Sequence, residues 1–177
     1  MIPSIKTIVR PATAWDAPAI HKIISTAFKK LLSEPGSAKT LKALDETEED
    51  ILKEMGTKRI LLCELDGVPV GSIRYHTIMG DFAYISRLGV LPQTQGCGVG
   101  GILIEEVVRE CEAKGIRAIV LHTSSAVMSS MRLYYKMGFF VAGISLNRGY
   151  YRALLVRELK KPSTIIDYAE LFEGSGL

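Results

Sequence analysis

The sequence predicts an α+β fold with a central, mostly antiparallel sheet of about seven strands, one β-α-β crossover and four helices. Three observations carry this prediction. Apolar residues alternate in some segments and recur at helical spacing in others, in the order β-α-α-β-β-β-α-β-α-β-β. Short turn signals join most neighbouring strand segments, but one clear helix separates two strands near the middle. The 177 residues, 47% of them apolar, suffice for one domain with a sizeable core.

The N-terminal third begins with a short strand at residues 5–10 and continues with two helices. Asp16 is the expected N-cap of the first helix, because Pro18 then falls in the first turn, where its missing N–H costs nothing. The second helix is expected to begin with a capping box, Thr47-x-x-Asp50, and to end at Gly56. The acidic run at residues 45–50 is interpreted as a solvated helix start.

The middle of the chain predicts three strands and a long helix. Residues 59–65 and 68–78 form a hairpin across Asp66-Gly67, and residues 83–90 form the next strand after Gly80-Asp81. The helix spans residues 98–114. Its charged side chains are expected to face water: Glu105, Glu106, Arg109, Glu110 and Glu112.

The last third predicts a buried strand, a helix and a final strand pair. The strand covers residues 116–122, and Ser124 or Ser125 is expected to cap a helix that runs to Met137. The strand pair covers residues 139–146 and 151–159. We therefore expect a single domain at residues 1–162 and a C-terminal tail at 163–177, with a weak helical pattern that can dock on the body or on a partner.

Composition excludes several classes of protein. The net charge of only +3, without strong clustering, argues against a nucleic-acid-coating protein. No apolar run approaches the roughly 20 residues that span a bilayer, and no signal-peptide pattern opens the sequence, so a cytoplasmic location is expected. The three cysteines and three histidines lack metal-ligand spacing, so no metal site is expected.

A glycine-rich segment, Gln95-Gly96-Cys97-Gly98-Val99-Gly100-Gly101, lies between a strand and a helix. Free amides and the dipole at a helix N-terminus form an anion site. Three interpretations compete: a dinucleotide fingerprint (G-x-G-x-x-G), a coenzyme A pyrophosphate loop (Gln95-x-x-Gly98-x-Gly100), and a turn that binds no ligand. The dinucleotide interpretation fits poorly, because five residues separate the strand from the first glycine and no acid ends the next strand.

In this loop and in two further segments, the chain resembles the GNAT superfamily of acyl-CoA-dependent N-acyltransferases. The residues that carry the resemblance are Leu88-Gly89-Val90-Leu91-Pro92, the loop Gln95–Gly100 and the helix end Leu133-Tyr134-Tyr135-Lys136-Met137-Gly138-Phe139. The resemblance implies the GNAT fold across residues 5–159, with a strand bulge that opens a V-shaped cleft.

The resemblance also implies a binding site for acetyl-CoA as co-substrate. Leu88 and Val90 would hold the pantetheine arm through their backbone. The pyrophosphate would lie on the amides of the loop residues Gln95, Gly96, Cys97, Gly98, Val99 and Gly100. Tyr134 would lie near the thioester sulfur. Two family features are absent: Val127 replaces a frequent Asn, and residues 83–90 contain no acid.

These residues predict an N-acetyltransferase that moves an acetyl group to a primary amine by direct attack in a ternary complex; the alternative is a non-catalytic acyl-CoA-binding module. Tyr134 is the candidate acid for the leaving thiolate. His122 is the candidate base, because its reference pKa lies near neutral pH, and a water relay is the alternative. Cys97 is interpreted as a small loop residue rather than a nucleophile.

The expected partner is a small-molecule or peptide amine, with no nucleic acid and no membrane. Arg148, Tyr150 and Tyr151 at the last hairpin are candidates for its pocket, whereas Arg74 and Arg87 remain unassigned. A homodimer is expected through the edge of the last hairpin and the apolar tail.

Overall fold

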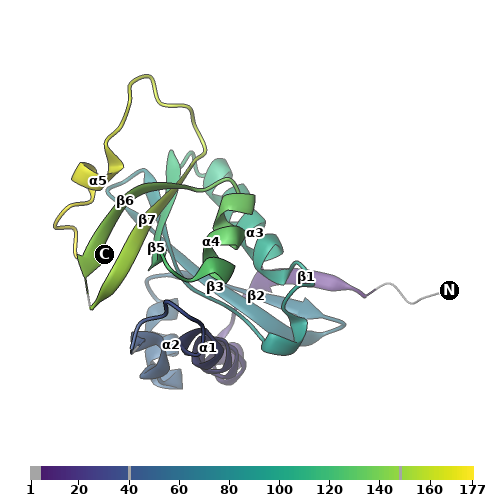
Figure 1. The fold of residues 1–177 in the computed structure, drawn as a ribbon. Coiled ribbons are helices and arrows are strands. Elements are labelled where there is room, and N and C mark those ends of the chain that lie inside the picture. The colour runs from purple at the N-terminus through teal and green to yellow at the C-terminus, as the bar shows by residue number, and fades with distance from the viewer. Residues whose placement is uncertain (1–4, 40, 148) are drawn as a thin grey trace.

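The computed structural model describes residues 5–39, 41–147 and 149–177, and its centre is one seven-stranded sheet (Figure 1). The strand order is β1-β2-β3-β4-β5-β7-β6. The strands are β1 (Thr7–Pro11), β2 (Arg59–Leu65), β3 (Val68–Ile78), β4 (Phe82–Val90), β5 (Ala118–Ser124), β6 (Phe140–Asn147) and β7 (Tyr150–Glu158). Neighbouring strands are antiparallel except β4 and β5, which are parallel. The predicted α+β fold with one crossover is confirmed.

The helices form layers on both faces of the sheet (Figure 1). Helices α3 (Val99–Ala113) and α4 (Met128–Lys136) cover one face, and α1 (Ala17–Leu32) and α2 (Glu48–Met55) cover the other. A short α5 (Tyr168–Leu171) in the C-terminal segment brings the described helices to five, one more than the four predicted for the body. No helix among the described residues is both long and apolar enough to cross a membrane.

Strand alternation divides the core into separate clusters. On β5, Ile119 and Leu121 pack with α3 and α4, whereas Ala118 and Val120 point to the opposite face. On that opposite face, part of the sheet is covered by α1 and α2, and another part by the C-terminal segment. Successive side chains of β5 therefore point to opposite faces of the sheet. This alternation determines the direction of each polar side chain at the end of the strand.

Two local predictions from turn and cap chemistry are confirmed. Asp66 and Gly67 both adopt positive φ, 49° and 80°, as a two-residue hairpin of this type requires. At α2 the Thr47 Oγ1 accepts from the amide of Asp50 at 3.2 Å, and Asp50 accepts from the amide of Thr47 at 3.0 Å. The helix ends at Gly56.

The prediction that Ser124 or Ser125 caps α4 is wrong. The helix begins at Met128 with Val127 at the N-cap position, three residues beyond Ser124. The Ser124 hydroxyl is engaged elsewhere, because it donates to the carbonyl of Gly36 at 2.7 Å. Ser125 likewise donates to the carbonyl of Tyr151 at 3.3 Å. Both hydroxyls therefore bond carbonyls of other segments instead of capping the helix.

Glu110 does not face water as predicted. Its carboxylate accepts from Arg59 Nη2 at 2.7 Å and from the Tyr75 hydroxyl at 2.6 Å, and its side chain is only 12% exposed. These partners lie on β2 and β3, far away in sequence, so helix periodicity alone could not reveal them.

Glu46 is also not solvated, because it belongs to a buried ion-pair network. Arg74 is fully buried and contacts Glu46 through Nη2 and Glu54 through Nη1, both at 2.6 Å. Arg87 Nε donates to the same Glu46 at 3.2 Å. Burial by itself would raise the pKa of Glu54, but hydrogen bonds from Lys58 and Arg74 lower it below its usual value.

The C-terminal tail docks on the body of the protein. Tyr168 and Phe172 are buried and lie edge-on to the Phe82 ring, with centroid distances of 6.3 and 5.4 Å. Ile165, which the helical pattern also included, is fully exposed. The segment therefore buries its aromatic side chains on its own chain.

Candidate active site

Strands β4 and β5 separate part-way along their length. Their parallel ladder pairs residues 82–84 with 118–120, although β4 continues to Val90 and β5 to Ser124. The β3–β4 ladder shifts register between Ser72 and Arg74, and Arg87 opposite the shift has a φ of 53°. Such a bulge bends a strand, so β4 diverges from β5 and a cleft opens between them. The V-shaped cleft implied by the resemblance is present.

The glycine loop closes one end of this cleft. Gly96 and Gly98 have φ of 84° and 85°, a left-handed conformation that favours glycine, and α3 begins at the next residue. The first turn-closing bond of α3 runs from the amide of Ile102 to the carbonyl of Gly98 at 3.0 Å. The amides before Ile102 therefore point out of the helix end, as an anion site requires.

A cavity of about 390 Å³ runs from this loop along β4. Seven of the eight residues predicted to bind the cofactor line it: Leu88, Val90, Gln95, Gly96, Gly98, Val99 and Gly100. Cys97 does not line it, and its side chain is exposed. The Cys97 amide is also engaged within the turn, because it donates to the carbonyl of Thr94 at 3.3 Å.

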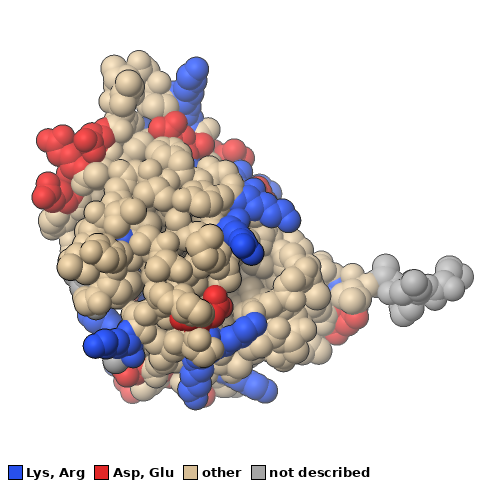
Figure 2. Space-filling model, viewed as in Figure 1, with Lys and Arg blue, Asp and Glu red and all other residues tan. Residues whose placement is uncertain are grey.

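The charge around this cavity is predominantly basic. Gln95 Nε2 donates to the carbonyl of Val90 at 3.2 Å, and its Oε1 accepts from Lys30, so α1 brings an ammonium group to the loop. Lys136 of α4 lines the same cavity, as does one carboxylate, Glu34. Figure 2 shows basic side chains on both sides of the groove, over α1 and over α4. These groups suit a polyanionic ligand such as a pyrophosphate.

Tyr134 lies on α4 where the first cavity meets a second one. Its ring packs edge-on against Phe139 at a centroid distance of 5.6 Å, and its side chain lines both cavities. Burial raises the pKa of its phenol well above the usual value. The hydroxyl therefore keeps its proton at neutral pH and is available as a donor.

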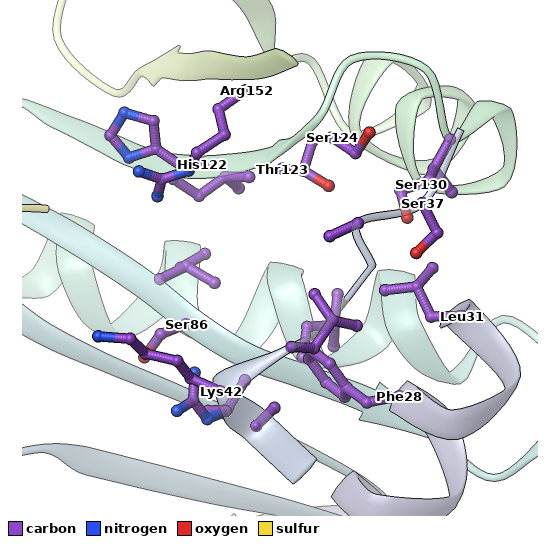
Figure 3. A pocket seen from close by; sticks show the side chains of 18 of the residues that line it. Phe28, Leu31, Ser37, Lys42, Ser86, His122, Thr123, Ser124, Ser130 and Arg152 are labelled. Carbon is purple, nitrogen blue, oxygen red and sulfur yellow. The ribbon is translucent and has the colours of Figure 1, made fainter. Parts of the chain in front are cut away.

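The second cavity, of about 310 Å³, lies between α1 and the ends of β4, β5 and β7. It shares Phe28, Leu31, Leu88, Ser130 and Tyr134 with the first cavity. The structure thus joins a loop suited to phosphates and a separate chamber through one common wall. In Figure 3, Leu31 and Ser130 lie at one end of this chamber, and His122, Arg152 and Lys42 lie toward the other.

His122 lines the second cavity from the face opposite to Tyr134. It follows Leu121, which packs with α4, so the alternation of β5 turns the imidazole to the other face of the sheet. There its Nδ1 lies 3.2 Å from the Tyr84 hydroxyl. Both candidate catalytic residues reach one cavity, but they do so from different sides.

The sequence did not point to the basic groups of the second cavity. Arg152, Arg87 and Lys42 line it, together with the hydroxyl-bearing Ser86. For Arg152 a signal existed: it opens the apolar run of β7 and shares the face of Leu154. For Lys42, in a short 3-10 turn (Lys42–Leu44), no sequence pattern indicated a site.

Of the residues at the last hairpin that were expected to line the acceptor pocket, only some do so in the described part of the structure. Tyr150 lines the second cavity, whereas Tyr151 is 62% exposed and does not. Arg148 lies outside the described residues. Within the described part of the chain, no three His, Cys, Asp or Glu side chains are arranged to hold a metal ion.

A family profile provides the assignment. The profile of the Acetyltransferase (GNAT) family matches residues 19–139, from α1 through the end of α4. The chain belongs to the GNAT family of acetyltransferases. The resemblance noted in the loop and in the helix end at Phe139 is thereby confirmed.

Individual GNAT relatives are distant. An uncharacterized N-acetyltransferase of Schizosaccharomyces pombe is 27% identical over 115 residues, which cover 63% of this chain and 71% of the relative. The crystal structure of PaiA N-acetyltransferase from Thermoplasma acidophilum, solved with coenzyme A, is 18% identical with a TM-score of 0.75 and covers 86% of this chain and 99% of that one. The ribosomal-protein-S18-alanine N-acetyltransferase of Escherichia coli is 17% identical with a TM-score of 0.71, covering 91% and 99%. At these identities the two structures establish the shared fold.

Proposed function

We propose that this protein is an N-acetyltransferase that moves an acetyl group from acetyl-CoA to a primary amine by direct attack in a ternary complex. The observation that carries the proposal is the shared wall of the two cavities, which includes Tyr134 and Ser130. One cavity ends at a phosphate-binding type of loop, and the other offers separate room for an acceptor. A module that only binds acyl-CoA has no need of this second chamber.

The cofactor site fits a pyrophosphate on the evidence of the loop itself. The left-handed Gly96 and Gly98 leave open space where a side chain would stand, and the α3 amides point toward it. Lys30 and Lys136 add positive charge beside it. The PaiA N-acetyltransferase of Thermoplasma acidophilum, which shares this fold, was solved with coenzyme A, and this supports coenzyme A as the ligand. Acetyl-CoA supplies the activated thioester.

The chain's own residues would then direct the transfer. The amine nitrogen forms a bond to the acyl carbon, the carbon–sulfur bond breaks, and Tyr134 donates to the departing thiolate. Its phenol is protonated at neutral pH, and because burial raises its pKa, Tyr134 stabilises the thiolate by donating a hydrogen bond rather than by giving up its proton completely. The amine proton passes through water to His122, whose imidazole lies beside Arg152 and away from Ser130 (Figure 3). A direct contact between His122 and the amine is not required.

The test is a thiol-release screen with acetyl-CoA against a panel of amines, with the mass of the acetylated product as the second readout. We expect release that depends on the amine, from a protein that also binds acetyl-CoA in calorimetry. Acetyl-CoA binding without transfer to any amine would instead support the acyl-CoA-binding module. A pH profile of kcat/KM that is identical in wild type and His122→Ala would exclude His122 from the proton path.

We also propose that the protein works in the cytoplasm and that the transfer requires no metal ion. We further propose that the protein forms a homodimer. Strand β6 is an edge of the sheet and exposes Phe140, Ile144 and Leu146, with exposed fractions of 43%, 61% and 69%. An apolar edge of this kind is normally covered. Light scattering that reports a monomer at micromolar concentration would contradict the dimer.

A further inference from the structure

The second cavity has a strongly one-sided charge. Three cationic side chains line it, Lys42, Arg87 and Arg152, and no Asp or Glu among the described residues does so. Arg87 pairs with Glu46, but that carboxylate is shared with the fully buried Arg74. A chamber built for a simple cationic amine would present carboxylates instead.

Arg152 is the informative member of this set. It is 4% exposed, and within the described part of the chain no carboxylate side chain lies within ion-pair distance of it. Among the described residues, its Nη1 donates to an oxygen of Leu177, the last residue of the sequence, at 3.2 Å, and its buried Nε has no partner. A guanidinium carries five N–H donors, and the bond to Leu177 uses only one of those of Arg152 within the described part of the chain. The side chain is therefore poised for an anion.

A second buried polar group points to the same conclusion. The Ser86 Oγ also lines the cavity and has no protein partner among the described residues. In Figure 3, Ser86 and Lys42 lie across the cavity from Arg152, while Leu31 and Ser130 lie toward the other end. The unpaired polar groups thus gather at the end far from the wall shared with the cofactor cavity.

We propose that the acceptor is a small amine that carries a carboxylate, with amino acids as the class. Its carboxylate binds Arg152, supported by Lys42 and the Ser86 hydroxyl, and its amine points toward Tyr134 and Ser130. A planar guanidinium matches a carboxylate in two-bond geometry. The cavity of about 310 Å³ accommodates a single amino acid. This inference rests on the proposed acetyl transfer and adds the identity of the acceptor class.

The experiment compares each amino acid with its own carboxamide, which keeps the side chain and the amine but removes the negative charge. Both kcat/KM for thiol release and calorimetric binding to the CoA-bound protein are measured. We expect the acids to be favoured by about 10- to 150-fold, the range of a hydrogen-bonded charge. The preference would run against intrinsic reactivity, because the amine of a carboxamide is less basic and a larger part of it is neutral.

Variants of the proposed carboxylate site test whether it causes the preference for acids over carboxamides. Arg152→Met should remove most of the preference, so that kcat/KM for an acid approaches the value for its own carboxamide in the same variant, and Arg152→Lys should restore part of the preference. Lys42→Met, at an exposed position where folding is not in question, should reduce the preference about 3- to 10-fold.

The outcomes distinguish the two proposals. Equal kcat/KM for acids and carboxamides, or an undiminished preference in Arg152→Met, would overturn the carboxylate site while acetyl transfer stands. Amino acids that bind but are never acetylated would overturn the reaction and leave the site. Peptides acetylated faster than every amino acid would show that the acceptor is a polypeptide and would refute the inference.

Discussion

Replacing Gly98 by aspartate places a carboxylate where we propose that the pyrophosphate binds. The structure predicts that the fold tolerates this change. A Cβ at Gly98 meets no atom within 4 Å, so the cost comes from its φ of 85° alone. That cost is about 1–2 kcal/mol for an ordinary residue, and Asp and Asn are among the residues that adopt this conformation most readily.

Gly98→Asn is the matched control, because it has the same shape and backbone preference but no charge. A carboxylate about 5 Å from a doubly charged pyrophosphate repels it, and at an effective dielectric constant of roughly 40 to 80 this repulsion makes the binding free energy of coenzyme A less favourable by about 2–3 kcal/mol. Coenzyme A should therefore bind the Asp variant about 30- to 150-fold more weakly than the Asn variant.

Isothermal titration calorimetry with coenzyme A measures this difference, and thermal unfolding checks that both variants fold. The ratio between the variants should shrink as salt is added. It should also disappear for pantetheine, which lacks the pyrophosphate. Equal affinity of the Asp and Asn variants for coenzyme A at low salt would refute the placement of the phosphates at this loop.

Four further measurements test other parts of the same structure. Tyr134→Phe should lower kcat by roughly 10²–10⁴-fold with little change in cofactor affinity, measured by steady-state kinetics; because burial raises its pKa, wild type should show no loss of kcat from this group below about pH 10. Cys97 should react rapidly with a thiol reagent while the two buried cysteines react only on unfolding, and an acetyl group trapped on Cys97 after incubation with acetyl-CoA alone would contradict direct transfer. Glu46→Gln should reduce the free energy of unfolding in urea by about 3 kcal/mol, because Arg74 is left with a single carboxylate. Since the pKa of Glu54 is lowered, its stabilising contribution is full above the ordinary glutamate pKa and is lost as the pH falls through the lowered value, so an acid titration that shows stability independent of pH below 5 would contradict its pairing.

Much of the fold could be predicted from local chemistry. The Asp66-Gly67 turn and the Thr47 capping box are decided by residues that are neighbours in sequence, and both are found where expected. The glycine loop belongs to the same class, because its positive φ angles and the start of α3 depend on a few adjacent residues. Such features can be inferred before the strands are placed.

The remaining features depend on which strands are neighbours. Glu110 is partly buried because β2 and β3 bring Arg59 and Tyr75 to it, and no periodicity within α3 contains this information. The face of His122 became clear only when the pairing of β5 with β7 and the packing of Leu121 were known. Sequence reasoning placed both His122 and Tyr134 near one cleft but not the side from which each one enters.

The two buried arginines of the sheet illustrate what a structure adds to residue identity. In the sequence, Arg74 and Arg152 look alike, since each is a cation followed by apolar residues in a predicted strand. In the fold, Arg74 meets two carboxylates at 2.6 Å, and its charge is matched within the protein. Arg152 is similarly buried, but among the described residues no carboxylate side chain pairs with it, and its Nη1 donates to an oxygen of Leu177, the last residue of the sequence. Since Arg74 would leave two carboxylate side chains behind and Arg152 leaves none, Arg74→Met should lower the thermal unfolding temperature, whereas Arg152→Met should leave it unchanged or raise it. This difference distinguishes a cation that holds the fold together from one that is kept for a ligand.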